Sequence, residues 1–220
     1  MATAHKAYRG LGMEGSVARW YDRTTRRDMP EFRALAARIA PHLPTGGAVL
    51  EIAPGPGFLA IELARLGFEV LGVDISRTFV ELARANAAAA PVSARFELGN
   101  ASALTVADAC MDGVVCRAAF KNFAEPVGAL KEMRRILRPG GTALLIDLRR
   151  DASLPEIRRF VDGLGVGWLN RMFMMATFRC MLIKRAYSLE DIRRMMAEAD
   201  WQDARIELTP IGFEVWMRKR

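Results

Sequence analysis

Short apolar runs alternate with longer amphipathic runs through the middle of the chain. The apolar runs have the length of buried strands, and the amphipathic runs repeat their hydrophobic residues at helical spacing. The predicted strands are residues 48–53, 69–74, 94–98, 114–116 and 142–148. The predicted helices between them are residues 57–66, residues 77–89 with Ser76 as N-cap, and a helix from Pro126 that ends before Pro139. This alternation predicts a parallel sheet with helices packed on it.

The two ends of the chain follow other patterns. Residues 16–40 predict two helices, of which the first carries Val17, Trp20 and Tyr21 and precedes the core. After Asp151 the alternation stops, and helix-like amphipathic runs predict a cap. A capping-box pattern at Ser188 begins another helix, and residues 205–208 and 213–217 predict an antiparallel hairpin. We therefore expect one domain over residues 1–220, divided into N-terminal helices (1–44), a core (45–150), a helical cap (151–187) and a C-terminal helix and hairpin (188–220).

A glycine turn after the first predicted strand carries the main chemical signal. Glu51 lies at the end of that strand, and Gly55 and Gly57 follow, where the missing β-carbon lets a ligand lie against the backbone. Asp74 ends the next strand, where a carboxylate can accept two hydrogen bonds from a ribose diol. Glu51 suits a cationic group such as an amino acid's ammonium, and Asn100 is placed to read an adenine edge. These residues together predict a site for a nucleoside cofactor.

With these residues the chain resembles the class I S-adenosylmethionine-dependent methyltransferases, and among them the small-molecule branch that includes the quinone-biosynthesis C-methyltransferases. Glu51, Gly55 and Gly57 match the first motif of the family, Asp74 its ribose-binding acid, and Asn100-Ala101 its adenine-contacting pair. Ala53 departs from the pattern, since many members carry Gly there. The resemblance implies an α/β fold: a Rossmann-like three-layer sandwich with a mostly parallel seven-stranded sheet, whose last strand is antiparallel and inserted beside the fifth.

The resemblance also implies an enzyme that uses S-adenosyl-L-methionine, releases S-adenosyl-L-homocysteine and methylates O, N or C of a small aromatic or apolar acceptor. The expected cofactor-binding residues are Tyr21, Glu51, Ala53, Gly55, Gly57, Asp74, Ile75, Asn100, Ala101 and Arg117. The expected substrate-contacting residues are Lys121, Asn122, Arg149, Met174, Met175 and Phe178. Each has a structural alternative: Asp74 can cap a helix, Asn100 can form a turn, and the methionine cluster can be the packed side of a helix.

Composition narrows the function further. A length of 220 residues, 51% of them hydrophobic, suffices for one well-buried domain. The net charge of +7 comes from scattered basic pairs rather than a long basic run, so a nucleic-acid partner is not indicated. Three cysteines without C-x-x-C spacing predict neither disulfides nor a zinc site. Without a signal-peptide core or an apolar run of spanning length, we expect a cytoplasmic monomer or homodimer.

Neither a metal nor a histidine base is expected. His5 and His42 lie outside the predicted site, and no cluster of carboxylates follows the fourth strand. Two alternatives stay open: a methyltransferase of RNA or protein, and a cofactor-binding protein that does not methylate and acts as a partner subunit or pericyclic catalyst. A nicotinamide oxidoreductase ranks last, although Gly55-x-Gly57-x-x-Ala60 fits its fingerprint, because no Tyr-x-x-x-Lys is visible.

Overall fold

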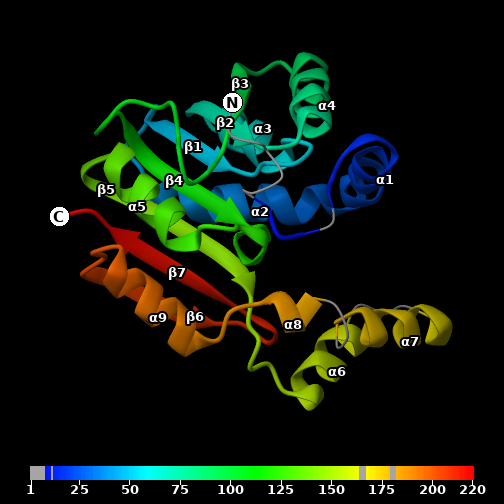
Figure 1. The fold of residues 1–220 in the computed structure, drawn as a ribbon. Helices are drawn as coiled ribbons and strands as arrows, with labels where there is room; N and C mark the ends of the chain where they lie inside the picture. The colour runs from blue at the N-terminus through cyan, green and yellow to red at the C-terminus, as the bar shows by residue number, and fades with distance from the viewer. Residues whose placement is uncertain (1–7, 11, 164–166, 179–181) are drawn as a thin grey trace.

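A sheet of seven strands runs through the computed structural model, which describes residues 8–10, 12–163, 167–178 and 182–220 (Figure 1). The strand order is β3-β2-β1-β4-β5-β7-β6. β7 pairs antiparallel with β5 and with β6, and the other pairs are parallel. The strands are β1 (Ala48–Ile52), β2 (Glu69–Asp74), β3 (Ala94–Leu98), β4 (Met111–Arg117), β5 (Leu137–Leu148), β6 (Asp203–Leu208) and β7 (Gly212–Arg218). The predicted sheet, with its last strand beside the fifth, is confirmed.

Helices cover both faces of this sheet and complete three layers (Figure 1). One face carries α2 (Met29–Ile39), α3 (Phe58–Arg65) and α4 (Arg77–Ala88), with α1 (Gly15–Thr25) beside α4. The other carries α5 (Pro126–Ile136) and α9 (Leu189–Glu198). Side chains of β1 alternate between the two cores: Val49 packs with α2 and α3, and Leu50 and Ile52 pack with α5 and α9. This two-sided burial explains the continuous apolar strands of the sequence.

The predicted helix starts are confirmed by their caps. Ser76 Oγ accepts a hydrogen bond from Phe79 N at 3.1 Å, which satisfies a free amide at the start of α4. Ser188 forms a capping box with Asp191 at the start of α9. Pro126 is the first residue of α5, where its missing N–H costs no intrahelical bond.

Two features of the elements differ from the sequence pattern. β5 begins at Leu137 rather than at residue 142, because the fully buried Leu137 pairs with Met111 and the ladder shifts register before Gly113. Trp20 of α1 is 58% exposed, so it does not pack in the core. The buried residues of α1 are Ala18 and Asp22, and Asp22 accepts a hydrogen bond from Asn86 Nδ2 of α4 at 2.9 Å.

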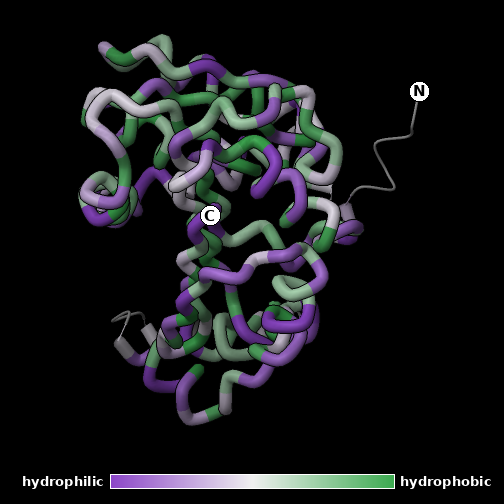
Figure 2. The backbone as a smooth tube through the Cα atoms, turned by 90° about the vertical axis from the view of Figure 1, so that its left-hand side faces the viewer, coloured by the Kyte–Doolittle hydropathy of each residue, from purple (hydrophilic) through white to green (hydrophobic). Residues whose placement is uncertain are grey.

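The cap lies at one end of the molecule, after β5 (Figure 1). Its helices are α6 (Leu154–Gly163), α7 (Trp168–Thr177) and the short α8 (Ile183–Arg185). They share a small apolar core built on Ile157, Val161 and Ile183. Hydrophobic and hydrophilic stretches alternate along the outer parts of the chain (Figure 2). In the part of the chain that the structure describes, no helix is long and apolar enough to cross a membrane.

Candidate functional site

The glycine turn lies where the parallel strands β1 and β2 end side by side. Ala53, Gly55 and Gly57 all have a left-handed backbone, with φ values of 55°, 55° and 81°. A β-carbon on Gly55 would meet no atom closer than 3.9 Å, the distance to the Tyr21 ring. The backbone of Gly55 is therefore open to a ligand, whereas Ala53 occupies a conformation that L-residues rarely adopt.

Gly57 also has a packing role that the sequence pattern did not indicate. A β-carbon there would lie 2.8 Å from the Phe96 ring and 3.0 Å from the β-carbon of Ala83. The missing side chain of Gly57 thus allows close packing of the start of α3 against β3 and α4. Gly57 positions the turn through this packing, and contact with a ligand stays a prediction.

Glu51 brings a buried carboxyl group to the same turn. It is only 4% exposed, and it accepts a hydrogen bond from the backbone of Ala60 in the first turn of α3. Its Oε2 atom has no hydrogen-bond partner among the residues that the structure describes. Burial raises the pKa of Glu51 to about 8. A buried oxygen without a partner is costly, so a cationic ligand group would both satisfy Oε2 and favour the ionised carboxylate.

Asp74 is the last residue of β2 and contacts the same turn. Its carboxylate accepts hydrogen bonds from Gly55 N at 3.0 Å and from Ser76 N at 2.9 Å. Burial raises the pKa of Asp74 to about 6, and these backbone N–H groups work against the rise. Because a carboxylate offers about four acceptor positions, Asp74 can hold the turn and still accept bonds from a diol. Asp74 does not cap α4, since Ser76 is its N-cap, and contact of Asp74 with a ribose diol stays a prediction.

The turn after β3 holds the predicted adenine pair. Asn100 Oδ1 accepts a hydrogen bond from Ser102 N at 3.0 Å, so the side chain forms a local turn. Asn100 and Ala101 are half-buried, as is Ile75 at the neighbouring end of β2. Oδ1 keeps a second lone pair and the amide nitrogen two donors, so contact of Asn100 with an adenine stays a prediction.

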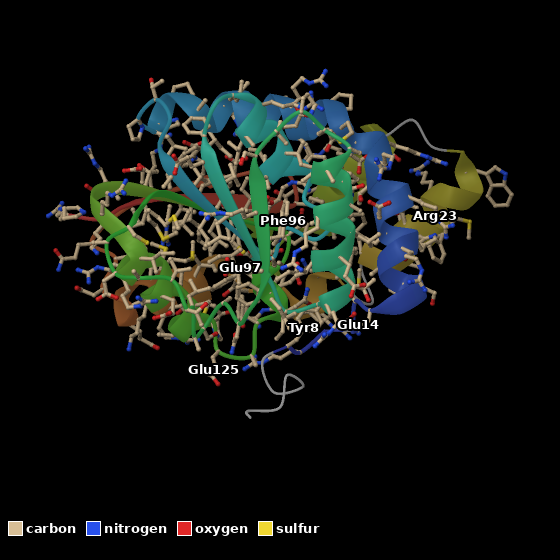
Figure 3. All side chains as sticks on the ribbon, turned by 90° about the horizontal axis from the view of Figure 1, so that it is seen from above. Tyr8, Glu14, Arg23, Phe96, Glu97 and Glu125 are labelled. Carbon is tan, nitrogen blue, oxygen red and sulfur yellow. The ribbon has the colours of Figure 1, made fainter. Side chains whose placement is uncertain are left out.

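Tyr21 and an N-terminal segment frame the turn. The Tyr21 ring packs edge-on against Phe79 with centroids 5.7 Å apart, and burial raises the pKa of its hydroxyl. Tyr8 forms a bridge with Phe123, and burial together with the charge of Asp74 raises the pKa of Tyr8. Figure 3 shows Tyr8 on the same edge of the molecule as Glu14 and Glu125.

Glu14 connects this segment to the start of α4 by hydrogen bonds. Its carboxylate accepts hydrogen bonds from Arg77 N and Thr78 N, each at 3.0 Å, at the start of α4. Ser76 Oγ also donates to the backbone oxygen of Met13 at 2.6 Å. We did not expect Tyr8 or Glu14 near the site, because neither belongs to a motif or a periodic run. An acidic residue just before a predicted helix was the only signal for Glu14.

The remaining cationic candidates already have partners. Lys121 Nζ lies 2.9 Å from Asp147 Oδ1 in a buried ion pair, and it also donates to the oxygen of Ala118. Arg149 binds Asp151 and Glu156 through its two terminal nitrogens. Arg149 Nε has no hydrogen-bond partner among the described residues, and contact of Lys121 or Arg149 with a substrate stays a prediction.

The other candidates divide between the site and the cap. Arg117 ends β4, with its guanidinium 4.7 Å from the Phe32 ring centroid. Asn122 accepts a hydrogen bond from Arg9 N through its backbone oxygen. Met174 and Met175 of α7 and its C-cap residue Phe178 are half-buried against the core of the cap. That packing is the structural alternative for the methionine cluster, and their contact with an acceptor is untested.

His42 and the surface hollow near β4 lie away from the glycine turn. His42 is exposed before β1, at the amino end of the sheet, and its ring lies 4.3 Å from that of Trp216. His5 lies outside the described residues. Across the described ranges, no group of three or more His, Cys, Asp or Glu residues is arranged to hold a metal ion. A surface hollow lined by Lys131 and Arg134 lies near the start of β4, and Arg134 there pairs with Asp200.

Comparisons with known proteins show what the chain is similar to. Residues 50–145 match the family model described as a methyltransferase domain. A demethylmenaquinone methyltransferase of Deinococcus radiodurans is 41% identical over 123 residues, which cover 55% of this chain and 50% of that protein. A ubiquinone/menaquinone biosynthesis C-methyltransferase of Geobacter sulfurreducens is 33% identical over 120 residues, which cover 52% and 45%. The chain spans about half the length of these curated relatives.

A solved structure extends the likeness to the whole fold. The crystal structure of a putative S-adenosyl-L-methionine-dependent methyltransferase from Methanococcus maripaludis is 21% identical, has a TM-score of 0.78 and covers 96% of this chain and 95% of its own. At that identity the likeness concerns the fold alone. The chain therefore has the fold of that putative methyltransferase, and its residues 50–145 are similar to a methyltransferase domain.

Proposed function

We propose that this protein transfers a methyl group from S-adenosyl-L-methionine to O, N or C of a small aromatic or apolar metabolite. One observation carries the proposal: the buried carboxyl groups of Glu51 and Asp74 flank an open glycine turn, and Glu51 Oε2 has no partner among the described residues. A cofactor with an ammonium group and a ribose diol supplies what these two carboxyl groups can bind. The residues present therefore fit S-adenosylmethionine.

Each part of the site has a distinct task in this proposal. Glu51 binds the ammonium group, Asp74 the ribose diol, and Asn100 with Ala101 the adenine. When bound, S-adenosylmethionine supplies a methyl group on a positively charged sulfur, which is already activated for transfer. The protein then has to hold the acceptor in line and exclude water, which needs orientation rather than an acid or base. Tyr21 and the segment that carries Tyr8 are placed to cover the site.

The relatives support an acceptor of low polarity, since two of them are named for menaquinone or ubiquinone biosynthesis. In our proposal the cap residues Met174, Met175 and Phe178 line the acceptor site, because methionines adapt to irregular apolar shapes. Asn122 contacts the acceptor from the loop after β4. The cytoplasmic location and the monomeric or dimeric state remain predictions.

The test measures product and by-product together. The purified protein is incubated with methyl-labelled cofactor and a panel of phenols, hydroquinones and amines, and both S-adenosylhomocysteine and labelled product are quantified. We expect release of S-adenosylhomocysteine in equal amount to the label transferred, and loss of both in Asp74→Ala. Label found only in added RNA or protein would favour the macromolecular alternative. A protein that binds the cofactor but labels nothing would favour the non-methylating alternative.

A further inference from the structure

Helix α7 of the cap turns large apolar side chains toward solvent. Trp168, Met172 and Phe173 are 69%, 64% and 73% exposed. Trp168 and Met172 are four residues apart and so lie on one face of the helix, with Phe173 beside them. The other side of α7 packs through Met174 and Phe178 into the core of the cap. The helix is therefore apolar on its packed side and on its exposed side, which is unusual for a surface helix.

The part of the cap that the structure describes also carries more positive than negative charge. The acidic residues of the cap form ion pairs with arginines. Arg149 pairs with Asp151 and Glu156, and Arg171 pairs with Asp162. The cations left over are exposed and, within the described ranges, take part in none of the ion pairs of the cap. They are Arg158 and Arg159 of α6 and Lys184 and Arg185 of α8. The cap thus combines an apolar face with unbalanced positive charge, on a chain whose net charge is +7.

The size of the apolar face favours a lipid surface over a second copy of the chain. With about 200 Å² for each fully exposed large side chain, the three residues expose roughly 400 Å². A stable protein interface buries about 800 Å² on each partner. A bilayer needs no complementary shape: aromatic and methionine side chains enter the boundary between headgroups and acyl chains, and cations bind anionic headgroups.

We propose that α7 docks this protein on the surface of an anionic lipid bilayer. Trp168, Met172 and Phe173 enter the boundary layer, while the four cations of α6 and α8 lie at the headgroups. This docking goes beyond the proposed methyl transfer and does not depend on it. It would bring the cap to the phase in which an apolar acceptor dissolves.

Vesicle flotation with the full chain tests the docking. Vesicles are phosphatidylcholine alone, or phosphatidylcholine mixed with phosphatidylglycerol. The test variant is Trp168→Ser with Phe173→Ser, and the matched control is Leu98→Ser with Leu208→Ser, since these leucines are 51% and 57% exposed on β3 and β6. We expect the protein and the control to float with the mixed vesicles and less so at high salt. The partition coefficient of the test variant onto the vesicles should be at least about tenfold lower, because the variant has lost the aromatic contact area.

Further measurements on the test variant show whether its fold and its cofactor site stay intact. Its circular dichroism and its calorimetric binding of S-adenosylmethionine should match those of the unmodified protein. Equal flotation of the test variant, or no flotation of the unmodified protein, would overturn the docking. Light scattering adds one more outcome: a dimer that the test variant dissociates, without vesicle binding, would overturn the docking and assign the face to a second copy. Methyl transfer to a water-soluble acceptor reports on the proposed function independently.

Discussion

Replacing Glu51 with Gln should weaken cofactor binding and abolish a proton release that accompanies it. Glu51 is buried, its Oε2 lacks a partner among the described residues, and its pKa is raised to about 8. In the free protein at neutral pH, roughly nine in ten Glu51 carboxyl groups are therefore protonated. An ammonium group favours the ionised carboxylate, so binding of S-adenosylmethionine should expel this proton.

The size of both effects follows from the structure. The unmodified protein should release about 0.9 proton from Glu51 at neutral pH, against about 0.1 from Asp74, whose pKa of about 6 leaves it mostly ionised. A hydrogen bond to a charged group contributes about 1.5–3 kcal/mol, so Glu51→Gln should raise the dissociation constant by roughly 10- to 150-fold. Gln resembles the protonated carboxyl group in shape, so the free protein should keep its fold.

Stability gives an independent readout of the same group. The pKa of Glu51 in the folded protein lies above the ordinary value of 4.5. Its contribution to stability is therefore fully present below about pH 4.5 and is lost as pH rises through about 8. Glu51→Gln removes this loss. The melting temperature of the unmodified protein should consequently fall, relative to that of the variant, as the pH is raised across this window.

Isothermal titration calorimetry at pH 7 in two buffers of different ionisation enthalpy measures the released proton and the affinity together. A melting curve of each protein at several pH values supplies the stability comparison. The reasoning would be refuted if the unmodified protein bound the cofactor without releasing a proton. It would also be refuted if the Gln variant kept both the affinity and the proton release.

Three further predictions concern the two sides of the site and its chemistry. Asp74→Ala should lose about a hundredfold or more in cofactor affinity by calorimetry, since two charge-assisted hydrogen bonds at roughly 1.5–3 kcal/mol each disappear; an unchanged dissociation constant in a folded variant would remove Asp74 from the site. Single changes of Met174, Met175 or Phe178 to Ala should alter acceptor KM or choice and leave cofactor affinity intact, whereas lower melting temperatures with unchanged acceptor kinetics would assign these residues to packing. His42→Ala should keep the rate within about tenfold, because loss of a general base usually costs ~10²–10⁴, and a chelator should have no effect; a thousandfold loss in the folded variant, or inactivation reversed by magnesium, would contradict this.

Local patterns in the sequence were enough for most of the helices and strands and for the meeting of Gly55 with Asp74. Alternating apolar and amphipathic runs predicted which segments of the core are strands and which are helices. Burial on both sides of a parallel sheet demands apolar strands, which is why these runs stand out. Ser76 and Ser188 marked helix starts, since a cap satisfies amides within three residues of itself. Gly55 and Asp74 were found together because the distance between them along the chain is set by one strand–helix–strand unit.

Only the tertiary structure decided which distant groups meet. Lys121 forms a buried ion pair with Asp147, which lies 26 positions away, and the sequence pattern did not indicate this contact. Glu14 reaches Thr78 across 64 positions, and no periodic signal encodes that contact. Helical spacing alone did not decide whether Trp20 packs in the core, and the packing of α1 leaves it exposed. The pKa of Glu51 likewise depends on burial from several elements at once. Periodicity in a sequence reports which side of an element faces the interior, whereas the partners of a charged or aromatic group depend on how whole elements pack.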